Sequence, residues 1–165
     1  NQTTMLASDT QAIADFLKQV MTDKYGADKM EAHFADTRDT LCYATNDNQS
    51  AVTWMLETKA DLAIVAGGYN SSNTSHLLEL CKENLPTYFI SNEDKILSQK
   101  DILHYDFHGR QEILTSNYLP HKEPAKILIT SGASCPDAIV EAVIRKVSGY
   151  FKLARTTEEI TGQFK

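Results

Sequence analysis

Hydrophobic positions divide the chain into a helical start and a longer region in which strands and helices alternate. Near the start, apolar residues recur at helical spacing: Ile13, Phe16, Leu17, Val20 and Met21. Ser8 and Gln11 have the spacing of a capping box, and Tyr25 and Gly26 interrupt the pattern. This predicts an amphipathic helix over residues 8–25. Residues 27–39 are polar and irregular, and we interpret them as a connection.

From residue 39 onward, short apolar runs alternate with helical stripes. The runs at 62–65, 87–90 and 127–130 predict buried strands. Stripes between and after them predict helices: Val52, Met55 and Leu56; Leu77, Leu80 and Cys81; Ile139, Val140, Val143, Ile144 and Val147. The pattern over residues 92–124 is less clear: it predicts turns at 92–93 and 108–109 and a loop that ends near Pro120 and Pro124. The predicted fold class is α/β, a parallel sheet flanked by helices.

Composition and charge narrow the possible partners. The 165 residues are about the length of one domain, with 42% hydrophobic and 23% charged positions. A formal net charge of -6 without a Lys/Arg cluster argues against a nucleic-acid partner. The apolar runs are far shorter than the roughly 20 residues of a membrane span, so no membrane partner is expected. The chain opens on Asn1 without a leader, and we interpret it as starting within a longer protein.

Two predicted strands are followed by polar loops that lead into helices, at residues 67–75 and 130–136. The carboxyl ends of parallel strands meet at one sheet edge, where free backbone N–H groups and helix dipoles favour an anion. Hydroxyl and amide groups without Lys or Arg favour a phosphate or diphosphate held by neutral donors. Alternatively, Ser72, Asn73 and Ser134 only cap helices. Because residues 70–73 exceed what one cap needs, ligand binding is favoured for Ser71 and Ser72.

The three cysteines are widely spaced, which favours a reducing compartment over a disulfide framework. Cys42 precedes a predicted helix, and helix N-termini favour the thiolate that a nucleophile or soft-metal ligand needs. The alternative for Cys42 is a small buried residue. Cys81 lies in an apolar stripe and is expected in the core, whereas Cys135 fits either role. No Arg follows Cys42 as a cysteine phosphatase requires, and the histidines show no paired metal-binding spacing.

Four motifs in order resemble one family. They are Gln2-Thr3-Thr4, Asp39-Thr40-Leu41-Cys42-Tyr43-Ala44-Thr45 with Gln49, Gly68-Tyr69-Asn70-Ser71-Ser72-Asn73, and Thr130-Ser131-Gly132-Ala133-Ser134-Cys135-Pro136-Asp137. Over residues 2–150 the chain resembles the carboxyl-terminal half of the LytB-type 4-hydroxy-3-methylbut-2-enyl diphosphate reductases, which serve the methylerythritol phosphate route to isoprenoids. The resemblance implies an oxidoreductase with three α/β lobes around a cavity.

The resemblance also implies roles for particular residues. Cys42 matches the third lobe's ligand to an iron-sulfur (4Fe-4S) cluster, and Thr3 matches a threonine that approaches the substrate hydroxyl. The residues that match the diphosphate ligands are Ser71, Ser72, Asn73 and Ser134. The implied reaction is a reductive dehydroxylation that yields isopentenyl and dimethylallyl diphosphate, with ferredoxin or flavodoxin as electron donor. The implied location is the bacterial cytoplasm, or the plastid for a plant-like source.

The expected organisation is one lobe and the end of another. Residues 1–38 would end the second lobe and connect it, 39–150 would form the third lobe, and 151–165 a tail. The remaining cluster cysteines would belong to an amino-terminal half, so this chain alone is expected to be inactive. One alternative is a stand-alone diphosphate-binding module without redox activity. Another is a sugar-phosphate or nucleotide-binding enzyme, which the absence of G-x-G-x-x-G and P-loop motifs disfavours.

Overall fold

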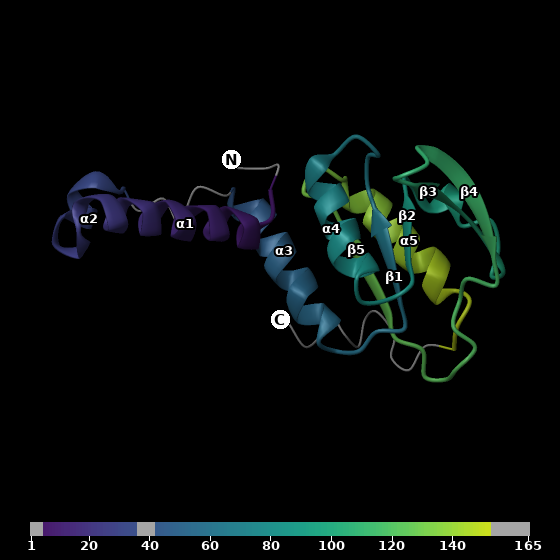
Figure 1. Cartoon of the computed structure of the whole chain (residues 1–165). Helices are drawn as coiled ribbons and strands as arrows, with labels where there is room; N and C mark the ends of the chain where they lie inside the picture. The colour runs from purple at the N-terminus through teal and green to yellow at the C-terminus, as the bar shows by residue number, and fades with distance from the viewer. Residues whose placement is uncertain (1–4, 36–41, 153–165) are drawn as a thin grey trace.

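In the computed structural model, which describes residues 5–35 and 42–152, three helices precede a region that contains both strands and helices (Figure 1). In order, they are α1 (Ala7–Tyr25), α2 (Ala27–His33), α3 (Tyr43–Leu56), β1 (Leu62–Ala66), α4 (Ser72–Lys82), β2 (Thr87–Ile90), η1 (Glu93–Lys95), β3 (Asp101–Asp106), β4 (Gln111–Ser116), β5 (Ile127–Ser131) and α5 (Asp137–Ser148). Within these residues, a parallel sheet has the strand order β2-β1-β5, and β3 and β4 form a separate hairpin. The predicted α/β fold class is confirmed.

Strand β1 lies at the centre of the parallel sheet. It pairs with β2 on one side and with β5 on the other, and all its residues are buried. Its side chains alternate between faces: Leu62, Ile64 and Ala66 belong to one hydrophobic cluster, and Ala63 and Val65 to the other. A strand with both faces covered needs a continuous apolar run, which explains why this segment was recognisable from sequence.

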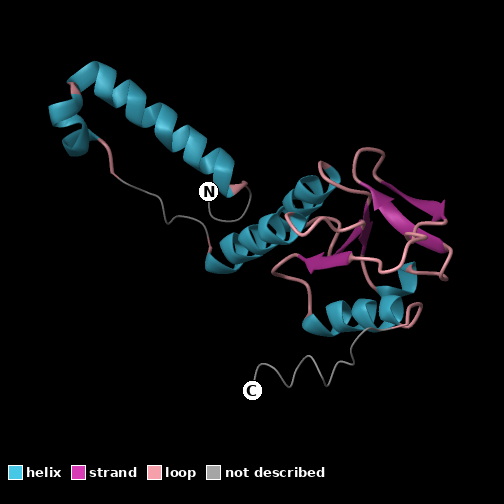
Figure 2. Ribbon diagram, turned by 90° about the horizontal axis from the view of Figure 1, so that it is seen from below, coloured by secondary structure: helices cyan, strands magenta, loops and turns pink. Residues whose placement is uncertain are grey.

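Helices cover both faces of this sheet (Figure 2). On the face of Ala63 and Val65, α3 contributes Val52, and α4 contributes an apolar stripe that includes Leu77 and Cys81. The opposite face is covered by residues from α5 and from the chain around the hairpin: Val143, Val147, Ile96, Ile102, Tyr118 and Leu119. The predicted strands and the three helices that pack on them are therefore confirmed.

The hairpin formed by β3 and β4 was not predicted. Its strands pair antiparallel from Asp101 opposite Ser116 to Asp106 opposite Gln111. It lies beside β2, where the ring of His104 meets that of Tyr88 edge-on, with 4.9 Å between centroids. The predicted turn at residues 108–109 is confirmed as the hairpin tip, but no strands were predicted on either side of it.

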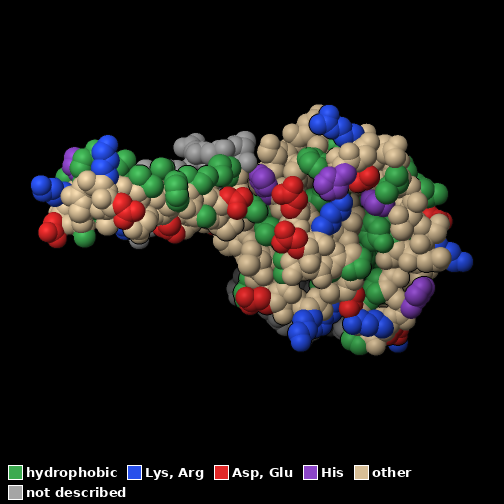
Figure 3. Space-filling model, viewed as in Figure 1, with side chains coloured by type: hydrophobic (Ala, Val, Ile, Leu, Met, Phe, Trp, Pro, Cys, Tyr) green, Lys and Arg blue, Asp and Glu red, His purple; other side chains and the backbone are tan. Residues whose placement is uncertain are grey.

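Helices α1 and α2 project from the α/β body (Figure 1). Within the described structure no residue of α1 is buried, and its apolar stripe includes Phe16 at 67% exposure. Figure 3 shows hydrophobic side chains gathered along this arm. Helix α2 corrects the interpretation of residues 27–39 as irregular, and the ring of His33 stacks on Tyr25 with 3.9 Å between centroids.

The start of α1 also differs from the prediction. Leu6 is the N-cap, so Ser8 lies inside the helix and forms no capping box. The reason is a tertiary contact, because the Ala7 amide donates to Oε1 of Gln49 at 3.0 Å. Thr3, residues 39–41 and almost all of the expected 151–165 tail lie outside the described residues. None of the described helices has the length and hydropathy of a membrane span.

Candidate anion-binding site

The carboxyl ends of β1 and β5 lie side by side at one edge of the sheet. Ala66 is in register with Ser131, and the Gly132 amide donates to the Ala66 carbonyl at 3.3 Å. Helix α3 reaches this edge too, since Nδ2 of Asn48 donates to the Ser131 carbonyl at 3.2 Å. The starts of α3, α4 and α5 are thus gathered at the edge where ligands bind in open parallel sheets.

Ser71 is the N-cap of α4. Its Oγ accepts from the Thr74 amide at 3.4 Å, and its carbonyl accepts from both the amide and the hydroxyl of Ser75. Ser72 follows as the first helical residue and is exposed. The cap of α4 is therefore Ser71, and not Ser72 or Asn73, for which a capping role was the alternative. The hydroxyl of Ser72 is exposed and available to a ligand.

The side-chain amide of Asn73 is the strongest indication of a ligand at this edge of the sheet. Its side chain is buried, with the residue only 8% exposed, yet neither Nδ2 nor Oδ1 has a hydrogen-bond partner in the described part of the chain. A buried polar group left unsatisfied costs roughly 1–3 kcal/mol. Such a group in the first turn of a helix, where backbone N–H groups are also free, is suited to an anionic ligand that accepts from the amide.

Thr74 explains why glycines occupy both loops. It is fully buried, and its Oγ1 has no partner among the described residues. A methyl group at Gly132 would overlap the Thr74 hydroxyl and lie 3.2 Å from its Cβ, and one at Gly67 would lie 3.1 Å from its Cγ2. The backbone of Gly67 also has φ 152°, which side chains rarely adopt. Both glycines therefore allow the start of α4 to approach the ends of β1 and β5.

Ser134 lies in the loop between β5 and α5 and is exposed. The loop turns sharply, with the Cys135 amide donating to the Gly132 carbonyl at 2.9 Å. Pro136, not Ser134, is the N-cap of α5. A capping role therefore does not explain Ser134 either, and its hydroxyl is free to face the same edge as the α4 loop.

The three thiols have different surroundings. Cys42 is exposed at the N-cap of α3, whereas Cys81 is fully buried in the core between α4 and the sheet. Burial raises the pKa of the Cys81 thiol to about 11, and burial followed by the charge of Asp137 raises that of Cys135. The expectation that Cys81 is a core residue is confirmed. Among the described residues, no three His, Cys, Asp or Glu side chains are grouped to hold a metal ion.

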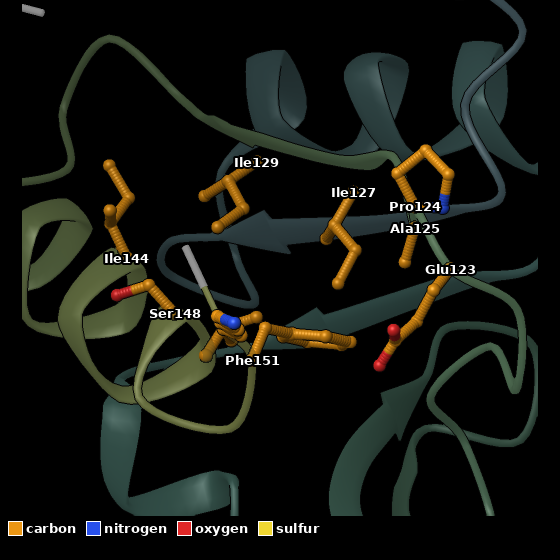
Figure 4. Close-up of a pocket in the computed structure, with 10 residues that line it drawn as sticks. Glu123, Pro124, Ala125, Ile127, Ile129, Ile144, Ser148 and Phe151 are labelled. Carbon is orange, nitrogen blue, oxygen red and sulfur yellow. The ribbon is translucent and has the colours of Figure 1, made fainter. Parts of the chain in front are cut away.

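A largely apolar cavity of about 580 Å³ lies between β5 and α5, away from the polar loops. Figure 4 shows Ile127 and Ile129 of β5 facing Ile144 and Phe151 across it. Its lining includes the first residue of β5 and the last turn of α5, so it lies toward the opposite end of the strands from the polar loops. Its apolar walls do not suit a diphosphate.

Two contacts at this edge were not predicted from the sequence: the hydrogen bond of Asn48 to Ser131 and the packing of Thr74 against the glycines. Asn48 stands among other polar residues at the start of a predicted helix. Its hydrogen bond to Ser131, far away in the same chain, could not be predicted from the local residue pattern. Thr74 lies inside the quoted polar stretch, and the glycines at 67 and 132 were the available signal that a neighbouring atom approaches the backbone there.

The fold and the edge define a class of protein: a parallel α/β fold with two polar strand-to-helix loops at one sheet edge and an exposed cysteine at the start of α3. Comparison with known families narrows this class. The family model described as "LytB protein" matches residues 1–148, and the chain belongs to this family.

Curated relatives named 4-hydroxy-3-methylbut-2-enyl diphosphate reductase are similar to this chain. The relative from Gloeobacter violaceus is 40% identical over 148 residues, covering 89% of this chain and 35% of the relative. The relative from Thermosynechococcus vestitus is 41% identical, with coverage of 89% and 36%. The chain thus spans about a third of the length of these relatives.

A solved structure supports the fold. It is described as the E-1-hydroxy-2-methyl-but-2-enyl-4-diphosphate reductase from Plasmodium falciparum, and it matches with a TM-score of 0.52 and 22% identity. The match covers 98% of this chain and 48% of that structure. At this identity the likeness concerns the fold alone.

Proposed function

We propose that this chain serves as the carboxyl-terminal part of a 4-hydroxy-3-methylbut-2-enyl diphosphate reductase and binds the diphosphate of the substrate. The reaction would consume two electrons and two protons and release the allylic hydroxyl as water, each turnover giving either isopentenyl or dimethylallyl diphosphate. The observation that carries the proposal is the buried and unpartnered amide of Asn73 in the first turn of α4. Family membership and the names of the curated relatives support it.

The diphosphate would be held by neutral donors. Free backbone N–H groups at the start of α4 would donate to the diphosphate, and the helix dipole would add a positive potential. Ser71, Ser72, Asn73 and Ser134 would contribute hydroxyl and amide groups from the two loops. Fixing the diphosphate in this way orients the rest of the substrate, so the role of these residues is positioning.

Cys42 would supply one thiolate to an iron-sulfur cluster. Its exposure at the start of α3, on the edge that carries the diphosphate loops, fits a ligand that meets a group bound between lobes. A 4Fe-4S cluster needs further thiolates, and Cys81 is buried in the core, so these would come from the remainder of the protein. When bound, the cluster supplies electrons for the reduction. Thr3 is proposed to contact the substrate hydroxyl.

The proposed organisation follows from these roles. Residues 1–38 would belong to the end of a second lobe, with residues 39–150 forming the third lobe and 151–165 a tail. The exposed apolar stripe of α1 supports this division, because its isolation from the α/β body suits a helix that packs elsewhere. A soluble electron donor such as ferredoxin or flavodoxin would complete the system.

Calorimetric titration with inorganic pyrophosphate tests the diphosphate site. The complete protein encoded by the gene is compared with its Asn73→Ala variant and with Asn84→Ala as a control. Asn84 lies just beyond the other end of α4, where Nδ2 donates to the Leu80 carbonyl at 2.9 Å. We expect Asn73→Ala to bind pyrophosphate about ten- to a hundredfold more weakly, the range for one hydrogen bond to a charged group.

Asn84→Ala should bind as the parent protein does. Because Asn73→Ala removes a buried amide without a partner, its unfolding midpoint should not fall below that of Asn84→Ala. Equal pyrophosphate affinity in Asn73→Ala and the parent protein would contradict the proposed site.

A further inference from the structure

The tip of the β3–β4 hairpin faces the start of α4 across a cavity of about 610 Å³. One wall contains Asn70 and Ser72 from the polar loop, and the other contains Phe107, His108 and Arg110 from the hairpin tip. Ser72 is thus both a proposed diphosphate ligand and part of this cavity. The volume falls within the usual range of small-molecule sites, roughly 300–1,000 Å³.

Tyr69, in the polar loop at residues 67–75, packs directly against the β3–β4 hairpin. The Tyr69 ring stacks on Tyr105 of β3, with 4.2 Å between centroids and 11° between planes. Its hydroxyl donates to Oε1 of Glu112 at 2.8 Å, and Lys95 donates to the same carboxylate at 2.6 and 2.8 Å. The hydrogen bonds from Lys95 and then Tyr69 lower the pKa of Glu112. Tyr69 immediately precedes Asn70, so hairpin and loop keep a fixed relation.

The tip itself is held in shape by Asp106. Its carboxylate accepts from the backbone amide of Gly109 at 3.0 Å and from that of His108 at 3.3 Å. A methyl at Gly109 would lie 2.6 Å from Oδ2 of Asp106, so the turn closes tightly around this carboxylate. Arg110 then leaves the turn with φ 51°, in the left-handed region. The turn therefore fixes the backbone position from which the Arg110 side chain extends.

Arg110 is available for a ligand. It forms no ion pair or hydrogen bond through its guanidinium among the described residues, although it lines the cavity. The one carboxylate in the lining, Glu79, lies two turns along α4 and is engaged by Nδ1 of His76 at 3.3 Å. The loops at residues 67–75 and 130–136 contain no Lys or Arg. A guanidinium on the facing wall would supply the positive charge that they lack, with a planar geometry suited to phosphate oxygens.

We propose that Arg110 contacts a phosphate group of the substrate diphosphate from across this cavity, which makes the β3–β4 hairpin part of the substrate site. This inference rests on the proposed function, because it requires the diphosphate to lie at the start of α4. Removal of the guanidinium should weaken diphosphate binding while leaving the chemical step intact. The substrate KM should then rise with little change in kcat.

Titration of the complete protein with inorganic pyrophosphate tests the proposal on Arg110→Ala and Arg110→Lys. Arg145→Ala is the control, because Arg145 is exposed on α5 and pairs with Glu141 at 2.5 Å. Arg110→Ala should lose about ten- to a hundredfold in affinity, the range for a charge-assisted hydrogen bond. Arg110→Lys should recover part of this loss, and Arg145→Ala should bind as the parent protein does. Matching thermal unfolding midpoints would exclude a folding defect.

The outcomes separate this inference from the proposed function. If Asn73→Ala weakens pyrophosphate binding and Arg110→Ala does not, the hairpin contact is wrong and the diphosphate site stands. If neither variant changes the affinity, both are wrong. Equal losses in Arg110→Ala and Arg145→Ala would show a general effect of net charge and would also overturn the contact.

Discussion

Gly132→Ala should destabilise the protein through one identifiable overlap. The added methyl would overlap the Thr74 hydroxyl, lie 3.2 Å from the Thr74 Cβ and lie 3.6 Å from Oγ of Ser71. Thr74 is fully buried and packs against Gly67 as well, so it has no free space into which to withdraw. The backbone of the β5–α5 loop must instead move away from α4. Overpacking of this kind costs about 1–3 kcal/mol, and we expect about 2 kcal/mol here.

A double-mutant cycle with Thr74→Ala isolates the cause. Thr74→Ala alone loses about one buried methyl, worth about 0.8 kcal/mol, but removes a buried hydroxyl without a partner in the described structure. These contributions oppose each other, so the single variant should be near neutral. In the Thr74→Ala background the Gly132→Ala methyl no longer meets a hydroxyl at position 74 and keeps only its contacts with the Cβ of that residue and with Oγ of Ser71. The cost of Gly132→Ala should then fall by about 1 kcal/mol, a coupling typical of contacting residues.

Urea unfolding followed by circular dichroism measures these free energies. Gly68→Ala is the matched control, because a methyl there meets no heavy atom within 4 Å. It should stay within about 0.5 kcal/mol of the parent protein. The reasoning is refuted if Gly132→Ala is as stable as Gly68→Ala. It is also refuted if the cost of Gly132→Ala is the same with and without the Thr74 side chain.

Further predictions concern a thiol, a cap and a carboxylate. A maleimide reagent should modify exposed Cys42 in the native protein and reach buried Cys81 only after unfolding, as mass spectrometry of digests can show. Ser71→Ala should lower the free energy of unfolding by about 0.5–2 kcal/mol, the cost of losing an N-cap. Because the folded-state pKa of Glu112 is lowered, its stabilisation is present above the ordinary Glu pKa and is lost as pH falls through the lower folded value. Glu112→Gln should therefore flatten the acid side of the stability profile in urea unfolding at several pH values. If Glu112→Gln has the same pH dependence of stability as the parent protein, the Glu112 carboxylate does not stabilise the fold as described.

The sequence was informative where one kind of interaction decides the local structure. Residues 62–66 form a strand covered on both faces, and a continuous apolar run leaves few alternatives. The hairpin was missed because its strands mix polar and apolar residues, such as Asp101 and Ile102, and depend on pairing with each other. The start of α1 was misplaced because Gln49, far away in sequence, satisfies its first amide. Such long-range contacts have no signature in local spacing.

The same distinction applies to the site. The positions of the loops that contain Ser71 and Ser134 could be predicted, because each loop follows a recognisable apolar strand and precedes a helical pattern. Burial of Asn73 without a partner could not be read from sequence, since it depends on how α4 packs on the sheet. The position of Arg110 depends on a hairpin that was itself unpredicted. The contribution of the hairpin's side chains to this cavity could therefore not be predicted from the sequence.

Anaerobic turnover of 4-hydroxy-3-methylbut-2-enyl diphosphate by the complete protein encoded by the gene tests the central claim most directly. The parent protein is compared with Cys42→Ser after reconstitution with iron and sulfide, using a chemical reductant in place of the natural donor. The account predicts that the parent protein forms isopentenyl and dimethylallyl diphosphate and that Cys42→Ser forms neither at a measurable rate. A parent protein that binds pyrophosphate but turns over no substrate, or a Cys42→Ser variant with full activity, would contradict it.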